Sequence, residues 1–203
     1  MERIFIENKL YRHIKTFAKG KIFFSEDFMD LGNIESINRA LSRLKDKGII
    51  NRLAQGIYFK PKKDDMVGII YPTIEEIAKG IAKRDKARII PTGVYALNKL
   101  GISDQVPMNT IFLTDGAART VKINKRTIKF KKTTPKNLMI KGEISSLIIQ
   151  ALKEIGKNNV NASYIEKIKK QLLKEKKEIV IHDAKLAPTW IRKILMEIIN
   201  EQL

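Results

Sequence analysis

Residues 35–61 read ESINRALSRLKDKGIINRLAQGIYFKP, and this stretch decides the fold of the first part of the chain. Its first half predicts a helix over residues 35–47, ended by Gly48, because a glycine commonly follows the last turn of a helix. Its second half holds two short β-prone runs, residues 49–53 and 57–61, on either side of a glycine turn. Two such runs around a turn indicate a β-hairpin.

The predicted helix has two chemically different faces. At 100° per residue, the apolar residues gather on one side: Ile37, Ala40, Leu41 and Leu44. The candidate base-reading residues are Ser36, Asn38, Arg39, Ser42 and Arg43. Arginine can pair with guanine and asparagine with adenine in the major groove of DNA, so this face suits a recognition helix. The alternative is an ordinary solvated helix face, and the pattern alone does not choose between the two.

The residues before this helix complete a familiar order of elements. Residues 1–19 predict an amphipathic helix ended by Gly20, and Ser25 is placed to cap a second, short helix. Three helices followed by a hairpin predict a winged helix-turn-helix DNA-binding domain over residues 1–66. Its wing carries side chains that we expect to contact backbone phosphates: Arg52, Gln55, Lys60, Lys62 and Lys63.

Composition supports a nucleic-acid partner and excludes several other classes. The 203 residues include 40 Lys or Arg against 22 Asp or Glu, a net charge of +18, which attracts polyanions. The absence of cysteine excludes disulfides, zinc fingers and a thiol nucleophile. No apolar run is long enough to cross a bilayer and the N-terminus lacks a signal-peptide pattern, so we expect a cytoplasmic protein with no membrane contact.

Residues 67–203 predict a mixed domain of helices and a small antiparallel sheet with a helical C-terminal tail, which makes the whole chain α+β. Helices are expected over 73–86, 92–100, 143–154 and 164–177 and from Pro188 onward, and strands over 110–114, 119–123 and 126–132. Strict alternation in the last two strands gives one apolar face and one basic face. The basic face holds Lys122, Lys125, Lys129 and Lys131, which either bind a partner or keep a solvated sheet soluble. Trp190 is interpreted as a packing anchor rather than as a platform for stacking a base.

Several segments together resemble a known family. They are ALSRLKDKG (40–48), IINRLAQGIY (49–58), PTGVYALNKLG (91–101), QVP (105–107) and FLTDG (112–116). This chain resembles the AbiEi-type antitoxins of type IV, or abortive-infection, toxin–antitoxin systems over most of its first 140 residues. The resemblance implies a repressor that binds inverted repeats in its own promoter. It also implies that the protein counters a nucleotidyltransferase-like toxin, usually without a stable complex.

The sequence offers little for catalysis. A Walker A loop, a Gly-x-Gly-x-x-Gly loop and a Gly-Ser dipeptide are all absent. The Glu175-Lys176-Lys177 run is expected by chance in a Lys-rich helix, Asp115 suits a turn, and His182-Asp183 suits a cap or surface pair. We therefore expect no enzyme activity, no cofactor and no metal site.

The sequence thus predicts a DNA-binding autorepressor and antitoxin. Two alternatives use the same basic surface without sequence-specific DNA binding. One is an RNA-binding module and the other is a protein-interaction module, and salt dependence and competition by RNA separate them from the main prediction.

Overall fold

The computed structural model describes residues 2–201, with side chains from Phe5 onward. Met1, Gln202 and Leu203, which the sequence prediction included in the two domains, lie outside the described residues. The chain divides into two compact units. One comprises residues 1–81 with 122–124, and the other comprises residues 82–121 with 125–203. The division therefore falls after residue 81 rather than after residue 66, because a second hairpin and most of a helix belong to the N-terminal unit.

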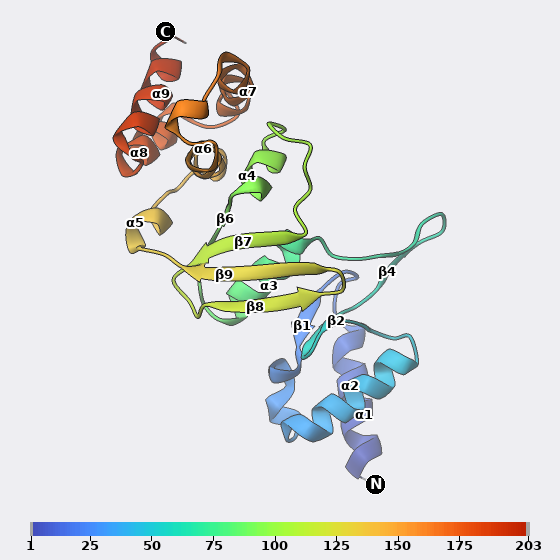
Figure 1. The fold of residues 1–203 in the computed structure, drawn as a ribbon. Coiled ribbons are helices and arrows are strands. Elements are labelled where there is room, and N and C mark those ends of the chain that lie inside the picture. Colours follow the sequence, from blue (N-terminus) through green and yellow to red (C-terminus); the bar gives the residue numbers. More distant parts are fainter. Residues whose placement is uncertain (1, 202–203) are drawn as a thin grey trace. The chain divides into compact units, whose positions relative to one another are not determined.

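The N-terminal unit is an ordered series of short elements (Figure 1). They are α1 (Glu2–Lys15), β1 (Ile22–Phe24), the 3-10 helix η1 (Ser25–Leu31), α2 (Ile34–Asp46), β2 (Asn51–Ala54), β3 (Ile57–Phe59), β4 (Lys62–Asp64), β5 (Gly68–Ile70) and α3 (Ile74–Arg84), whose last turn belongs to the other unit. The three helical segments and the β2–β3 hairpin lie where the sequence predicts them.

The apolar faces of these helices meet in one core. Leu10 and Ile14 of α1, Ile37 and Leu41 of α2, and Phe28 of η1 are fully buried. Rings from neighbouring segments pack edge-on or stacked at centroid separations of 5–6 Å, which adds a geometric preference to the burial of apolar area. The apolar stripe of α2 therefore faces the core, as its sequence periodicity predicts.

Two local details differ from the sequence prediction. Ser25 does not cap η1: its side chain is buried and donates to Oδ1 of Asn38 at 2.7 Å, while the cap comes from Asp27, which accepts from the Phe24 amide at 2.9 Å. Strand β1 was not anticipated. It pairs antiparallel with β3, placing Ile22 opposite Phe59, and so turns the hairpin into a three-stranded sheet of order β1-β3-β2.

The C-terminal unit combines a sheet with a helical layer, which confirms the α+β class. Its elements are β6 (Ile89–Thr92), α4 (Val94–Lys99), β7 (Asn109–Thr114), β8 (Arg119–Ile123), whose last two residues are grouped with the other unit, β9 (Arg126–Lys132), α5 (Pro135–Leu138), α6 (Glu143–Ile155), the 3-10 helix η2 (Lys157–Asn159), α7 (Ala162–Leu172), α8 (Lys177–Leu186) and α9 (Thr189–Asn200). The sheet has the order β6-β7-β9-β8. Strands β6 and β7 are antiparallel, whereas β7 and β9 are parallel, so this sheet is mixed rather than purely antiparallel.

The helical tail is divided more finely than its sequence pattern indicates. The single helix predicted over residues 164–177 is instead α7, which ends at Leu172, followed by the separate helix α8, which begins at Lys177. Apolar stripes from these helices and from α4, α6 and α9 share one core. Within it, α6 is the most enclosed helix, with a continuous buried run over residues 145–152.

Two carboxylates from α8 and the loop before it hold the N-terminus of α6. The buried Asp183 accepts from the amides of Lys141 and Gly142 at 2.9 and 2.8 Å and from the Ser145 hydroxyl at 2.5 Å. Glu175 accepts from the amides of Ile144 and Ser145 at 3.1 and 2.7 Å. The free amides of a helix N-terminus and its positive dipole end both favour negative charge, so these acids stabilise the helix at its start.

The environment of Asp183 gives its carboxylate a clear preference for the charged form. Burial raises its pKa, but the hydrogen bonds from Ser145, Lys141, His182 and Gly142 outweigh burial and lower the pKa below the ordinary value. Because the pKa of Asp183 is lower in the folded than in the unfolded chain, its charged carboxylate stabilises the fold at pH values above the unfolded pKa of about 3.9. This stabilisation is lost as the pH falls through the folded-state pKa.

Replacing Asp183 by Asn is therefore expected to lower the free energy of unfolding at pH 7 by about 2–3 kcal/mol, since the amide keeps the shape but loses the charge-assisted bonds. Urea unfolding followed by Trp190 fluorescence measures this. The exposed Asp104, replaced by Asn, is the matched control and should change little. The difference between wild type and Asp183→Asn should shrink as the pH is lowered below 4; a difference independent of pH would contradict the charged cap.

Candidate nucleic-acid interface

The outward face of α2 holds the predicted base-reading residues. Asn33 caps the helix by accepting from the Ser36 amide at 2.9 Å, which fixes where the first turn begins. Asn38, Arg39 and Ser42 are exposed, whereas Ser36 and Arg43 are half-buried. The structure thus brings all five residues onto one helix and leaves three of them openly presented to solvent.

Arg39 is the most accessible cation of this face. Its side chain is 65% exposed and its only described ion pair is to Glu35, one turn earlier, at 3.8 Å. Exposed pairs of this spacing contribute little and are readily exchanged for another anion. Arg39 therefore keeps both the charge and the freedom that a groove contact requires.

Arg43 is held by a residue that the sequence pattern did not reveal. Glu7 of α1 accepts from Nε of Arg43 and from Nζ of Lys47, each at 2.5 Å. These hydrogen bonds, from Lys47 first and then Arg43, lower the pKa of Glu7. Because the pair joins residues 36 positions apart, no local periodicity could predict it. The Arg43 side chain is still 40% exposed, and its ion pair with Glu7 restrains its orientation.

Asn38 is exposed but already makes one hydrogen bond within the protein. Its Oδ1 accepts from the Ser25 hydroxyl at 2.7 Å, while its amide nitrogen carries two donors. Recognition of adenine uses both the oxygen and the nitrogen of an asparagine. The contact with Ser25 therefore fixes the orientation of the amide, and a base would share the oxygen with Ser25.

The β2–β3 hairpin presents a short polar tip. Gly56 has φ +69°, a left-handed conformation that glycine adopts without strain, and Gln55 beside it is exposed. Arg52 is also exposed, and its Nε donates to the Ala54 carbonyl at 3.2 Å. Both side chains lie where the sequence placed them, on a wing-like hairpin.

Lys60 caps the C-terminal end of α1. Its ammonium donates to the carbonyls of Lys15, the last residue of α1, and Phe17, just after it, at 2.7 Å each. A cation at a helix C-terminus satisfies carbonyls that lack partners within the helix. The phosphate contact predicted for Lys60 would compete with these bonds, so Lys60 is better understood as a cap than as a wing residue.

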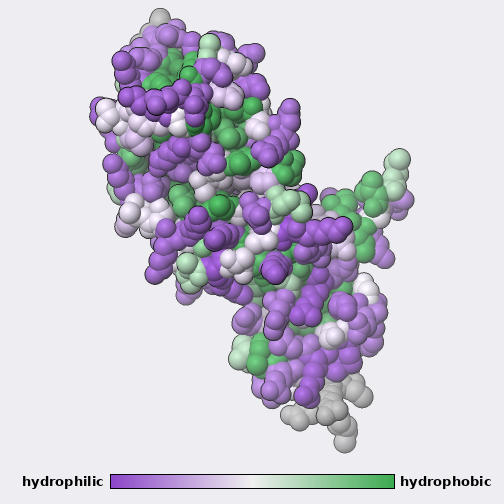
Figure 2. Space-filling view, in the orientation of Figure 1, coloured by the Kyte–Doolittle hydropathy of each residue, from purple (hydrophilic) through white to green (hydrophobic). Residues whose placement is uncertain are grey.

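Lys62 and Lys63 belong to a different hairpin from the wing. They lie on β4, opposite Ile70 and Ile69 of β5, and all the residues of both strands are exposed. Hydrophobic residues gather toward the tip of this β4–β5 hairpin (Figure 2), where Met66 is 94% exposed. The predicted set of wing cations is thus distributed over two hairpins of the N-terminal unit.

The second basic surface follows the predicted alternation. Ile128 and Phe130 of β9 are buried while Lys129 and Lys131 are exposed, and Lys122 on β8 and Lys125 in the turn are exposed as well. On the β7 side, Lys129 and Lys131 lie opposite Ile111 and Leu113. Like charges therefore do not face one another across that strand pair.

The acidic side chains of the three candidate catalytic motifs all have partners within the fold. Asp115 accepts from the Arg88 amide at 2.8 Å and from its Nε at 2.9 Å, which joins the end of β7 to the start of β6. Glu175 and Asp183 cap α6, and His182 Nδ1 lies 2.7 Å from Oδ1 of Asp183. Among the residues that the structure describes, no group of three or more such side chains is placed to hold a metal ion. No helix within residues 2–201 is both long and apolar enough to cross a membrane.

Comparison with known proteins adds a family and a fold relative. A family model described as "Family of unknown function (DUF6088)" matches residues 9–180. No curated protein sequence matches the chain. The crystal structure of the RV2827C protein from Mycobacterium tuberculosis is similar with a TM-score of 0.50 and 12% identity, covering 98% of this chain and 76% of that one. At this identity the likeness concerns the fold alone.

The Glu7 contacts lead to a stability prediction. Glu7→Gln removes the charge that neutralises Arg43 and Lys47, so the unfolding free energy of the N-terminal unit should fall by about 1 kcal/mol. Hydrogen exchange of the α1 and α2 amides measures this change in the unit itself. Glu35→Gln, which removes the exposed pair with Arg39, is the matched control and should have less than half the effect. Equal effects of the two variants would show that Glu7 has no special role.

Proposed function

This chain belongs to DUF6088, a family of unknown function, and we propose that it is a DNA-binding transcriptional autorepressor and antitoxin whose N-terminal unit is a winged helix-turn-helix. The observation that carries the proposal is the outward face of α2. An amphipathic helix buries its apolar stripe in the unit's core and presents Asn38, Arg39 and Ser42 to solvent, with Arg43 beside them. This is the division of faces that a recognition helix needs.

The order and pairing of the neighbouring elements support the same proposal. Helix α2 follows η1 directly, and the β2–β3 hairpin follows α2, with β1 pairing to β3 as the third strand. In winged-helix proteins the helix enters the major groove while the hairpin meets the backbone or the adjacent minor groove. Here Arg52 and Gln55 would occupy that second position.

Affinity and specificity would come from different residues. Lys62 and Lys63 carry exposed charges on the β4–β5 hairpin and would contact phosphates, which strengthens binding to any sequence. Arg39 and Arg43 would hydrogen-bond base edges, with guanine as the partner that arginine prefers. Because Lys60 caps α1, we leave it out of the phosphate-binding set.

We expect Arg39→Ala to weaken binding to the operator by about 1–3 kcal/mol and to flatten the preference for it, because one base contact is lost. Gel shifts on a duplex from upstream of the protein's own gene and on a scrambled duplex measure both effects. Lys62→Ala should weaken binding to the two duplexes equally and reduce the salt slope by about one. Arg192→Ala removes an exposed charge from α9 and controls for net charge.

Each possible result of this assay has a definite meaning. An equal loss on both duplexes with Arg39→Ala would refute a base-reading role. Complete competition by tRNA would favour the RNA-binding alternative, and binding that is indifferent to salt would favour a protein-interaction module.

The antitoxin role is proposed from the resemblance to AbiEi-type proteins. We expect the neighbouring gene to encode a nucleotidyltransferase-like toxin whose expression arrests growth, and co-expression of this chain to restore growth. Arg39→Ala should still restore growth when expressed from a foreign promoter, because the proposed repression and neutralisation use different contacts. Failure of the wild-type chain to restore growth would remove the antitoxin role and leave the DNA-binding proposal standing.

A further inference from the structure

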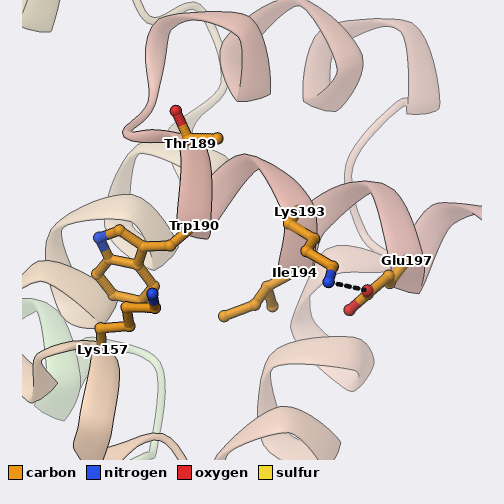
Figure 3. Close-up of a pocket in the computed structure, with 6 residues that line it drawn as sticks. All are labelled: Lys157, Thr189, Trp190, Lys193, Ile194 and Glu197. Carbon is orange, nitrogen blue, oxygen red and sulfur yellow. Dashed lines mark ion pairs between the residues drawn. The ribbon is translucent and has the colours of Figure 1, made fainter.

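A pocket of about 620 Å³ opens on α9 in the C-terminal unit (Figure 3). Its lining consists of Lys157, Thr189, Trp190, Lys193, Ile194 and Glu197. Cavities of 300–1,000 Å³ are typical of sites for small organic ligands. None of these residues takes part in the proposed DNA-binding surface, so the pocket calls for an explanation of its own.

The pocket follows from the way in which α9 divides its faces. Ile191, Leu195 and Ile198 are buried in the core, and the residues one position before each of them form the adjoining face. Trp190, Ile194 and Glu197 follow one another at helical spacing along that face. Lys157 reaches the pocket from η2, just after Gly156, whose φ of +80° turns the chain at the end of α6.

Trp190 packs against the helical core, as predicted, and it also lines the pocket. The indole is only partly buried. A rigid aromatic surface fixed in this manner is suited to stacking a flat ring, and base–aromatic stacking contributes about 1–3 kcal/mol per base.

The charges of the pocket indicate an anion beside that ring. Lys157 lies at the Trp190 end, and Lys193 lies toward the other end, 3.9 Å from Glu197 (Figure 3). Lys193 and Glu197 are 79% and 57% exposed, so their pairing is weak and Lys193 can turn to another anion. With two cations and one carboxylate, the lining has an excess of one positive charge, which suits a ligand with a small negative charge.

We propose that this pocket binds a nucleotide, with the base stacked on Trp190 and the phosphate held by Lys157 and Lys193. The nucleotide is either a free mononucleotide or the phosphorylated end of a single strand, which share the same chemistry. Glu197 disfavours a triphosphate, because its carboxylate lies beside the lysine that would have to neutralise the extra charge. This inference is independent of the proposed winged helix and stands or fails separately.

Trp190 is the one tryptophan of the sequence, so intrinsic tryptophan fluorescence reports on this pocket alone. The full-length protein is titrated with AMP, with ATP and with a 5′-phosphorylated single-stranded oligonucleotide. We expect saturable quenching by AMP, by the oligonucleotide, or by both, and the stronger ligand identifies the source. ATP should bind more weakly than AMP because of Glu197.

Lysine variants provide the decisive comparison. Replacing Lys157 and Lys193 together by Ala should weaken nucleotide binding at least tenfold. Replacing the exposed Lys170 and Lys177 of the same unit removes equal charge outside the pocket and should leave binding unchanged. All four lysines are exposed, so both variants should fold, as circular dichroism can verify.

Adenosine and inorganic polyphosphate separate stacking from charge. Adenosine should quench weakly, since it stacks without a phosphate, and polyphosphate should not quench, since it has no ring. No saturable quenching by AMP or the oligonucleotide would overturn the proposal. Equal quenching by polyphosphate, or equal losses in the two lysine double variants, would also overturn it.

Discussion

The burial of one apolar stripe decides what the N-terminal unit can offer to a partner. Helix α2 has four positions that contribute to the core: Ile37, Ala40, Leu41 and Leu44. Removing this stripe from water stabilises the unit by about 25 cal/mol for each Å² buried, and the helix cannot rotate without exposing it. Packing of the apolar side therefore turns the polar side of α2 outward. The exposure of Arg39 thus depends on four buried residues on the opposite side of the same helix.

The C-terminal unit depends on a different kind of constraint. Helix α6 is enclosed by its neighbours, and the unpaired amides at its N-terminus would be costly to bury. Asp183 and Glu175 together accept hydrogen bonds from four backbone amides around this N-terminus, so both acids are committed to the fold. Gly142 completes the arrangement, because a Cβ there would overlap oxygens of Glu175 and Ser145.

The parts of the structure that the sequence predicts are those set by neighbours along the chain. The stripe of α2 and the alternation of Lys129 with Phe130 both follow from local spacing. So does the start of the helix expected from residue 73, where Thr73 accepts from the Glu76 amide at 3.2 Å. Contacts between distant segments were not predictable in this way. Glu7 with Arg43, Lys60 with the end of α1, and the parallel pairing of β7 with β9 all depend on how the segments meet in space. In the candidate site, therefore, the residue types were predictable, while their internal partners were not.

The contact between Glu7 and Arg43 has a consequence for any encounter with a ligand. An unrestrained arginine samples many rotamers, and immobilising such a side chain at an interface costs about 0.5–1.5 kcal/mol. Glu7 already narrows that sampling in the unbound protein, so part of the conformational entropy is lost during folding rather than during association. Helix α1 would in this way preorganise a side chain of the proposed DNA-binding face.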